Sequence, residues 1–194
     1  MVTQELKDII NQQRNSGFVA DDDRIHIETR NARNVLMRGL VHFCGEETQW
    51  LPEYEEVAEW LADNKSRGLL CYGNCGRGKS LICQKILPII FRSWHGLIMN
   101  VVSMADISNK FNSISDKKII SLDDVGTESI ANQYGEKHDY FRELVDLAER
   151  KQKLIVITTN LSLSEIKERY GERTIDRLHA LTKTILFKGN SLRK

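Results

Sequence analysis

The chain has 194 residues, of which 41% are hydrophobic and 28% charged, a composition typical of a globular domain with a buried core. The formal net charge is +1, so overall charge does not indicate a nucleic-acid partner, and any basic surface must be local. No apolar run approaches the roughly 20 residues that a membrane span needs, and the first residues lack the pattern of a signal peptide. We therefore expect a cytoplasmic protein with no membrane partner.

The first third of the chain is expected to consist of helices. Apolar residues recur on one side of 3–14, and the acidic run from Asp21 to Asp23 that follows is typical of solvated surface. A further helix is expected over 31–43, and another begins after Pro52, a residue suited to a first helical turn. This region therefore has helical rather than strand-like periodicity.

From residue 68 onward, short apolar runs alternate with helical periodicity. The runs indicate buried strands, and they occupy residues 68–73, 97–102, 118–124, 154–160 and 182–188. This alternation predicts an α/β fold with a parallel sheet covered by helices on both faces. We divide the chain into a helical N-terminal region, 1–45, as a candidate partner-binding part, and a main α/β domain, 46–194.

Pro88 lies inside the helix expected to start after residue 78. Because proline lacks a backbone N–H group, this helix should kink or break between Gln84 and Pro88.

The chain contains four cysteines, Cys44, Cys71, Cys75 and Cys83, whose spacing fits no zinc pattern. We expect reduced thiols, each in the role of a small buried apolar residue.

One segment matches the phosphate-binding pattern G-x-x-x-x-G-K-[ST] in full. In chain order it consists of Gly73, Asn74, Cys75, Gly76, Arg77, Gly78, Lys79 and Ser80. Glycines let the backbone wrap around phosphate oxygens, and N–H groups at a helix N-terminus bind them. Lys79 should reach the β- and γ-phosphates, and Ser80 should ligate Mg²⁺. Because the segment follows an expected strand and opens an expected helix, it predicts that the chain binds ATP with Mg²⁺.

Two carboxylates, Asp123 and Asp124, end the strand expected over 118–124. Ligands of open α/β sheets bind at the carboxyl ends of the strands. Asp123 is the expected Mg²⁺ partner, and Asp124 is expected to orient or deprotonate the attacking water. Glu128 is a reserve candidate, with a surface charge as its alternative role.

Three further polar residues are candidates for contacts with the γ-phosphate. Asn160 ends a buried strand that should lie beside the phosphate-loop strand, and its amide could hold the attacking water. Arg173 and Arg177 are four residues apart and share one face of a helix. An arginine supplied by a neighbouring subunit would stabilise transition-state charge, whereas a surface ion pair is the simpler alternative.

Five segments, in this order, resemble the DnaC/DnaI helicase-loader and IstB transposition-helper ATPases of the AAA+ class: GNCGRGKS, ISLDDVG, IVITTN, GERTIDRL and FKGNSLR. The resemblance covers about Gly68 to Arg193. It implies a P-loop NTPase fold of AAA+ type, with a five-stranded parallel sheet flanked by helices and little or no C-terminal lid. It also implies Asn160 as the first sensor and Arg193 as the second. Arg177 corresponds to the finger that acts in trans, and Arg173 is an alternative.

The resemblance further implies an ATPase that forms homo-oligomers through ATP-bridged interfaces. It would act on a replicative helicase, on single-stranded DNA, or on both, as a helicase loader does. A transposition helper with a transposase as partner is one alternative. A nucleotide-gated binding module that hydrolyses ATP weakly is another, because the second carboxylate is the shorter Asp124.

Overall fold

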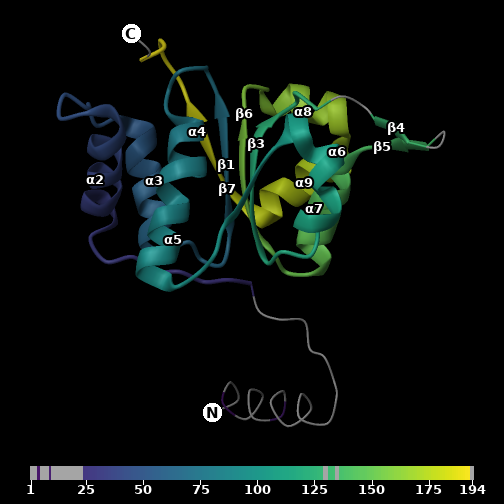
Figure 1. Ribbon diagram of the computed structural model, residues 1–194, viewed down its shortest axis with the longest axis horizontal. Coiled ribbons are helices and arrows are strands. Elements are labelled where there is room, and N and C mark those ends of the chain that lie inside the picture. The colour runs from purple at the N-terminus through teal and green to yellow at the C-terminus, as the bar shows by residue number, and fades with distance from the viewer. Residues whose placement is uncertain (1–3, 5–8, 10–23, 129–130, 134–135, 193–194) are drawn as a thin grey trace.

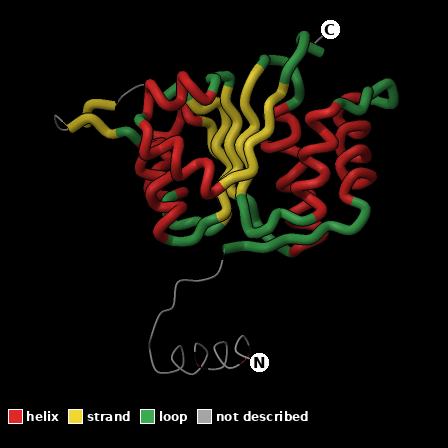
Figure 2. The backbone as a smooth tube through the Cα atoms, turned by 180° about the vertical axis from the view of Figure 1, so that it is seen from behind, coloured by secondary structure: helices red, strands yellow, loops and turns green. Residues whose placement is uncertain are grey.

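The computed structural model describes residues 24–128, 131–133 and 136–192, together with residues 4 and 9. Its centre is a five-stranded parallel sheet with the strand order β2-β3-β6-β1-β7. Figure 2 shows this sheet edge-on between two layers of helices. Its strands are β1 (Gly68–Gly73), β2 (Asn100–Ser103), β3 (Ile119–Val125), β6 (Leu154–Thr159) and β7 (Thr182–Phe187).

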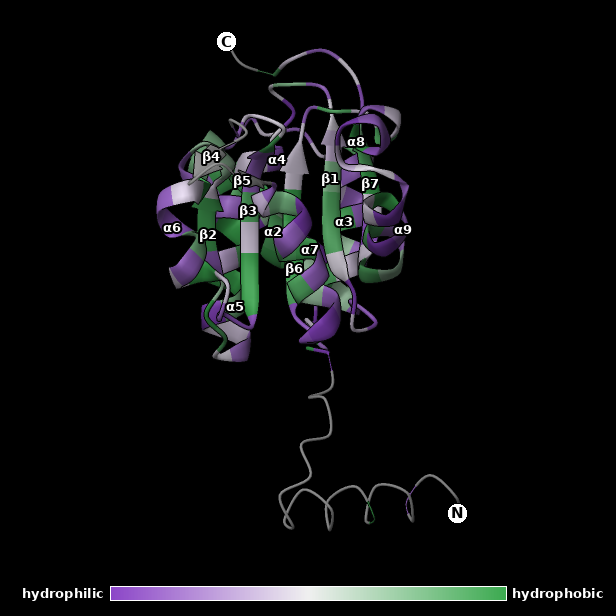
Figure 3. Ribbon diagram, turned by 90° about the vertical axis from the view of Figure 1, so that its right-hand side faces the viewer, coloured by the Kyte–Doolittle hydropathy of each residue, from purple (hydrophilic) through white to green (hydrophobic). Residues whose placement is uncertain are grey.

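Each face of the sheet carries its own group of helices, and Figure 1 shows both groups. One face is covered by α2 (Ala32–Cys44), α3 (Pro52–Ala62), α4 (Lys79–Leu81), η1 (Ile82–Ile86) and α5 (Leu87–His95). The other is covered by η2 (Met104–Asp106), α6 (Ile107–Ile114), α7 (Tyr140–Arg150), α8 (Leu163–Tyr170) and α9 (Glu172–Leu181). In Figure 3 the hydrophobic colour concentrates on the strands between these layers, as expected for strands buried on both faces.

The strand order brings three distant segments of the sequence together. β6 pairs with β1 on one side and with β3 on the other, with Cys71 opposite Thr158 and Leu122 opposite Ile157. The expectation that the strand before Asn160 lies beside the phosphate-loop strand is therefore confirmed. Since all strands are parallel, their carboxyl ends meet at one edge of the sheet, where ligands bind.

The helices and strands predicted from periodicity form with small shifts. The strand expected over 97–102 begins later, at Asn100. The S-x-x-E pattern from Ser162 to Glu165 predicts a capping box, and that box forms at the start of α8. The segments 3–14 and 21–23 lie outside the described residues, apart from the isolated helical residues 4 and 9. A two-stranded hairpin was not predicted, and it consists of β4 (Ala131–Gln133) and β5 (Glu136–His138).

The irregularity predicted at Pro88 takes the form of a change of helix type. Residues Ile82–Ile86 form a π-helical stretch, and α5 starts at Leu87 with Pro88 in its first turn. Proline cannot donate to the preceding turn, and the wider π-helical turn directly before it accommodates this change in the hydrogen-bond pattern. The helix that follows the phosphate loop therefore continues without a break.

The N-terminal helix α2 packs into the same apolar core as the sheet. Leu36 and Leu40 are fully buried beside α3 and η1. Gly39 lies against Ile86 so closely that a Cβ atom at residue 39 would be 2.5 Å from Ile86 Cγ2. This contact is one that only glycine permits. A functional boundary at residue 45 remains a prediction.

The four cysteines are free, but they do not share one environment. Cys71 and Cys83 are buried with their Sγ atoms 3.7 Å apart. Cys44 and Cys75 are exposed, so the expectation that all four are buried is wrong for these two. Both lie at the edge of the cavity described below, where a side chain keeps some contact with solvent. In the described part of the chain, no helix has the length and apolar character needed to cross a membrane.

Candidate functional site

The phosphate loop has the backbone geometry that anion binding requires. Gly73, Gly76 and Gly78 have φ of 113°, 72° and 90°, in the region that side chains with a Cβ atom disfavour. In the described part of the chain, the backbone N–H groups from Cys75 to Ser80 donate to no acceptor. The loop therefore presents free donors at the start of α4, which suits a phosphate group.

Two residues of α3 form hydrogen bonds with Arg77 of this loop. Arg77 Nε donates to Glu53 Oε1 at 2.8 Å, and both side chains are buried, with exposed fractions of 10% and 5%. The Tyr54 hydroxyl donates to the Arg77 carbonyl oxygen at 3.1 Å. Burial, reinforced by the Glu53 charge, raises the pKa of Tyr54 to about 12, so Tyr54 remains a donor at neutral pH. Arg77 is thus a structural anchor of the loop.

The last described residues cross the same loop from the other side. The Leu192 N–H group donates to the Gly76 carbonyl oxygen at 2.9 Å, and Asn74 Nδ2 donates to the Gly189 carbonyl oxygen at 2.8 Å. A Cβ atom at residue 76 would lie 2.1 Å from Ser191 Oγ. Gly76 is therefore required for close packing as well as for its φ angle.

Lys79 is buried, and its ammonium group uses all three of its donors. Lys79 Nζ donates to the carbonyl oxygens of Gly73 at 2.7 Å and Asn74 at 2.8 Å, and to Asn160 Oδ1 at 2.9 Å. Burial lowers its pKa, and the nearby Cys75 and Asp124 oppose that shift. A bound phosphate would supply the negative charge that this buried ammonium group lacks.

A bulge and a buried threonine shape the acidic end of β3. The strand register shifts between Leu122 and Val125, and Asp124 adopts a φ of 54°. Thr158 Oγ1 donates to Asp123 Oδ1 at 2.6 Å and accepts from the Asp124 N–H group at 3.0 Å. Thr158 therefore orients the Asp123 carboxylate and fixes the backbone at Asp124. The sequence analysis gave this residue no role, although its place one strand away from Asp-Asp was a signal.

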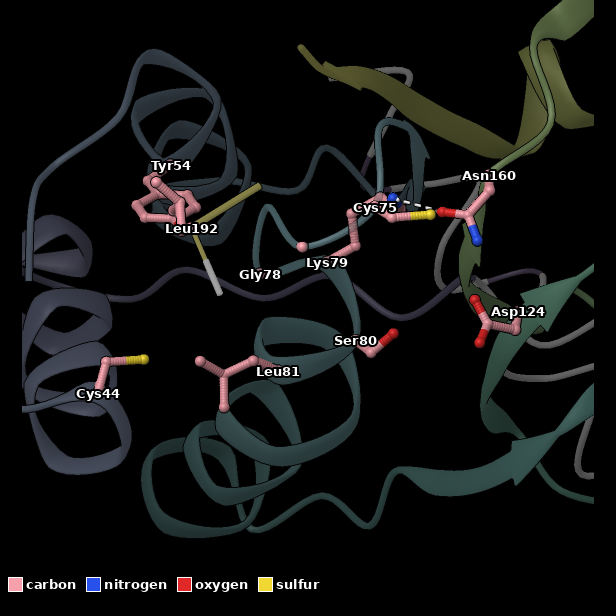
Figure 4. Close-up of a pocket in the computed structure, with 11 residues that line it drawn as sticks. Cys44, Tyr54, Cys75, Gly78, Lys79, Ser80, Leu81, Asp124, Asn160 and Leu192 are labelled. Atoms are coloured by element: carbon pink, nitrogen blue, oxygen red, sulfur yellow. Dashed lines mark hydrogen bonds between the residues drawn. The ribbon is translucent and has the colours of Figure 1, made fainter. Parts of the chain in front are cut away.

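A cavity of about 380 Å³ brings most of the predicted residues together at the carboxyl edge of the sheet. Figure 4 shows the Ser80 hydroxyl pointing toward the Asp124 carboxylate, with Lys79 and Asn160 joined by a hydrogen bond. Asp123 precedes Asp124 in β3 but does not line the cavity. The lining residues are Cys44, Tyr54, Cys75, Gly76, Gly78, Lys79, Ser80, Leu81, Asp124, Asn160 and Leu192.

The residues present fit both expected cofactors. The free N–H groups and Lys79 suit a polyphosphate, and the Ser80 hydroxyl with the neighbouring carboxylates supplies the oxygen ligands that Mg²⁺ prefers. The opposite end of the cavity is more apolar and is lined by Cys44, Tyr54 and Leu81. A nucleobase would find an apolar surface there.

The two candidate arginines lie outside the cavity, on α9. The Arg177 guanidinium is paired with Asp146 and with Glu149 of α7, the latter at 2.5 Å from Nε, and its side chain is 14% exposed. Arg173 is exposed and has no ion pair within the described residues. Arg193 lies outside the described residues, and its proposed sensor role remains a prediction.

Glu128 is not a surface charge, so that alternative is wrong. Its side chain is buried and accepts from the Gly126 N–H group at 2.8 Å and from the Tyr170 hydroxyl. Arg169 Nη2 donates to its carbonyl oxygen at 2.9 Å. Glu128 thus fixes the turn after the acidic strand to α8, and it does not line the cavity.

Replacing Glu53 with alanine should lower the free energy of unfolding by about 3–5 kcal/mol, because it leaves the buried Arg77 guanidinium without a carboxylate. Urea unfolding measures the change. Glu56→Ala, on an exposed position of the same helix, is the matched control and should cost less than about 1 kcal/mol. Equal losses in the two variants would contradict the role given to the pair.

Comparisons with known proteins identify the fold. No protein-family model and no curated protein sequence matches the chain. The crystal structure of DnaI matches with a TM-score of 0.53 and 17% identity, over 92% of this chain and 89% of that chain. The DnaC helicase loader matches with a TM-score of 0.51 and 19% identity, over 83% and 93%. AMPPCP-bound DnaA from Aquifex aeolicus matches with a TM-score of 0.54 and 13% identity, over 74% and 49%.

The chain has the AAA+ fold of DnaC and DnaI. Identities of this size speak for the fold alone. The predicted AAA+ architecture is confirmed, including its five-stranded parallel sheet. Within the described residues, no helix follows β7.

Proposed function

We propose that this chain is an Mg²⁺-dependent ATPase of AAA+ type that acts in DNA replication in the manner of a helicase loader. The observation that carries the proposal is the convergence of Lys79, Ser80, Asp124 and Asn160 on one cavity. These residues come from three neighbouring strand ends, and the free N–H groups of the phosphate loop face the same space.

Each side chain of the cavity has a chemical role in this proposal. Lys79 and the loop N–H groups bind the phosphates, and Ser80 with Asp123 holds Mg²⁺, which supplies charge neutralisation when bound. Asp124 orients the attacking water, and Asn160 assists from the neighbouring strand. Because Asn160 Oδ1 accepts one of the Lys79 donors, binding of a phosphate by Lys79 would release this amide for the water.

The partners are proposed from the fold likeness. The similar structures include a protein described as a helicase loader, and another is a replication protein bound to a nucleotide analogue. We propose that this chain assembles side by side in the presence of ATP and contacts a replicative helicase, with residues 1–45 contributing to that contact. Single-stranded DNA is proposed as a further ligand.

ATP hydrolysis measured across a range of protein concentrations, with and without single-stranded DNA, tests the proposal. Specific activity should rise with concentration, because a shared site is completed only by assembly, and Asp124→Asn should abolish turnover. Absence of multiple turnover in the wild-type protein would leave a nucleotide-gated binding module instead. If the protein does not capture a cognate hexameric helicase, with or without ATP, the proposed loader role is rejected, whereas the proposed ATPase activity is not.

A further inference from the structure

Two stretches of the sequence contain no acidic residue, although the chain has 27 Asp and Glu in all. Residues 29–45 hold three Lys and Arg, and residues 64–105 hold six, without one carboxylate side chain. The first stretch contains α2, and the second contains α4, η1 and α5. These helices cover the same face of the sheet (Figure 1). The helix α3 on the same face carries Glu53, Glu55, Glu56 and Glu59, so the basic character is local to α2 and the η1–α5 helix and does not extend over the whole face.

Three contacts show that α2 and the η1–α5 helix run antiparallel beside each other. Thr29 Oγ1 lies 2.9 Å from His95 Nε2, just before α2 and at the end of α5. Gly39 packs on Ile86 at the middle of α2. At its end, Lys85 Nζ lies 5.8 Å from the centre of the Phe43 ring. The two helices thus form one continuous surface.

The outward side of this surface is basic with apolar side chains between the charges. Lys85, Ile89 and Arg92 are spaced at i, i+4 and i+7 and are all exposed. Arg38 is exposed on α2, and Phe43 is 38% exposed. We refer to Arg38, Phe43, Lys85, Ile89 and Arg92 as the α2–α5 stripe.

Within the described residues, the cations of the stripe lack a carboxylate partner. In the described part of the chain, Arg38, Lys85 and Arg92 form no ion pair. The acidic residues nearest in sequence, Glu28 and Glu46, lie beyond the two ends of α2. Arg33, by contrast, points to the other side of α2 and pairs with Glu55 of α3 at 3.2 Å. Unpaired cations are free to bind an external polyanion.

We propose that the α2–α5 stripe binds the phosphate backbone of a single-stranded nucleic acid. Lys85 and Arg92 are separated by about 10 Å along the helix axis at 1.5 Å per residue, a distance that a flexible single strand follows easily. Phe43 and Ile89 lie between the cations, and apolar side chains gain contact with bases only when the bases are unpaired. Lys85 and Arg92 also belong to a stretch of sequence without carboxylates.

The stripe adjoins the nucleotide cavity. Cys44, which follows Phe43, and Leu81, four residues before Lys85, both line that cavity. This inference rests on the proposed function, because it names the surface that would hold the single strand. We expect the two ligands to influence each other, because the π-helical η1 carries Lys85 and directly follows α4, which carries Lys79 and Ser80, and such stretches often occur at functional sites.

Fluorescence anisotropy with a labelled single-stranded oligodeoxynucleotide tests the stripe. The double variant Arg38→Glu/Arg92→Glu should bind about tenfold or more weakly, and its dependence of log K on log salt should be shallower by about 1.4, since each phosphate contact to a single strand contributes about 0.7. The matched control, Lys117→Glu/Arg150→Glu, makes the same change of net charge at exposed positions on the opposite face. It should bind as the wild type does.

Further ligands distinguish a single-strand site from other kinds of binding surface. An RNA strand of the same sequence should bind comparably, and a duplex should bind more weakly. If both double variants lose the same oligonucleotide affinity, or if the duplex binds more tightly than the single strand, the stripe is not the binding site. Binding of poly-glutamate in preference to the oligonucleotide would assign the surface to an acidic protein instead. Mg-ATP affinity, measured on the same variants, should be unchanged. Normal ATP binding without oligonucleotide binding would reject this inference but not the proposed ATPase.

Discussion

Replacing Lys79 with alanine should reduce ATP affinity by about 100-fold or more while leaving the fold largely intact. The side chain is the buried cation of the cavity, and a hydrogen bond to a charged group is worth about 1.5–3 kcal/mol. Among the described residues, no other lysine or arginine lines the cavity. Isothermal titration calorimetry with Mg-ATP measures the affinity.

The controls for this prediction separate binding from folding. Lys85→Ala removes an exposed lysine six residues further along the same helix and should bind ATP as the wild type does. Removal of Lys79 also breaks its bonds to Gly73, Asn74 and Asn160, so circular dichroism and thermal unfolding should accompany the titration. Submicromolar ATP affinity retained by a folded Lys79→Ala protein would refute the assignment of the phosphate loop.

Replacing Arg177 with alanine should lower ATP hydrolysis by about 10³-fold at concentrations where the protein assembles, with little change in ATP affinity. In this structure the guanidinium is paired with Asp146 and Glu149 of its own chain. The Arg177 side chain is 14% exposed and the two carboxylates are 42% and 38% exposed, so each pair lies between an exposed pair, worth about 1 kcal/mol or less, and a buried one. An effect of 10³-fold corresponds to about 4 kcal/mol. A role for Arg177 at a neighbouring subunit therefore requires that both pairs open on assembly.

Arg173→Ala is the matched comparison, because it removes an exposed arginine from the same helix. The helix α9 ends at Leu181 and leads directly into the start of β7, which lies at the amino ends of the strands, away from the cavity. Arg173, near the start of α9, is therefore nearer to the carboxyl ends of the strands and to the phosphate loop than Arg177 is. Loss of activity in Arg173→Ala alone would transfer the finger role to that residue. Wild-type hydrolysis in both variants, or specific activity independent of protein concentration, would count against any finger acting in trans.

Much of this architecture could be read from local pattern. Short apolar runs marked the buried strands, because a parallel sheet covered on both faces has no polar side. Ser162 and Glu165 marked the start of α8, since the capping box depends only on neighbours in the sequence. The hairpin β4–β5 was missed, because its short strands carry no hydrophobic alternation long enough to detect.

Contacts between distant segments could not be read in this way. The Arg77–Glu53 pair joins residues 24 positions apart, and a phosphate-loop arginine is expected from pattern alone to face the ligand. Glu128 was expected at the surface, because nothing local shows that Tyr170 and Arg169 cover it. Thr158 was treated as part of a strand end, although its hydroxyl bonds the Asp123 carboxylate and the Asp124 backbone N–H group of the neighbouring strand.

The sequence by itself determined the phosphate loop, the acidic strand end and the alternation that makes an α/β fold, because glycine conformation, charge and hydrophobic period act over a few residues. Only the tertiary structure decided which side chains meet. It placed β6 between β1 and β3, so that Asn160 bonds Lys79 and Thr158 bonds Asp123. It also set α2 beside α5 and gathered their cations on one surface. Both outcomes depend on strand order and helix packing, which arise from burial summed over the whole chain.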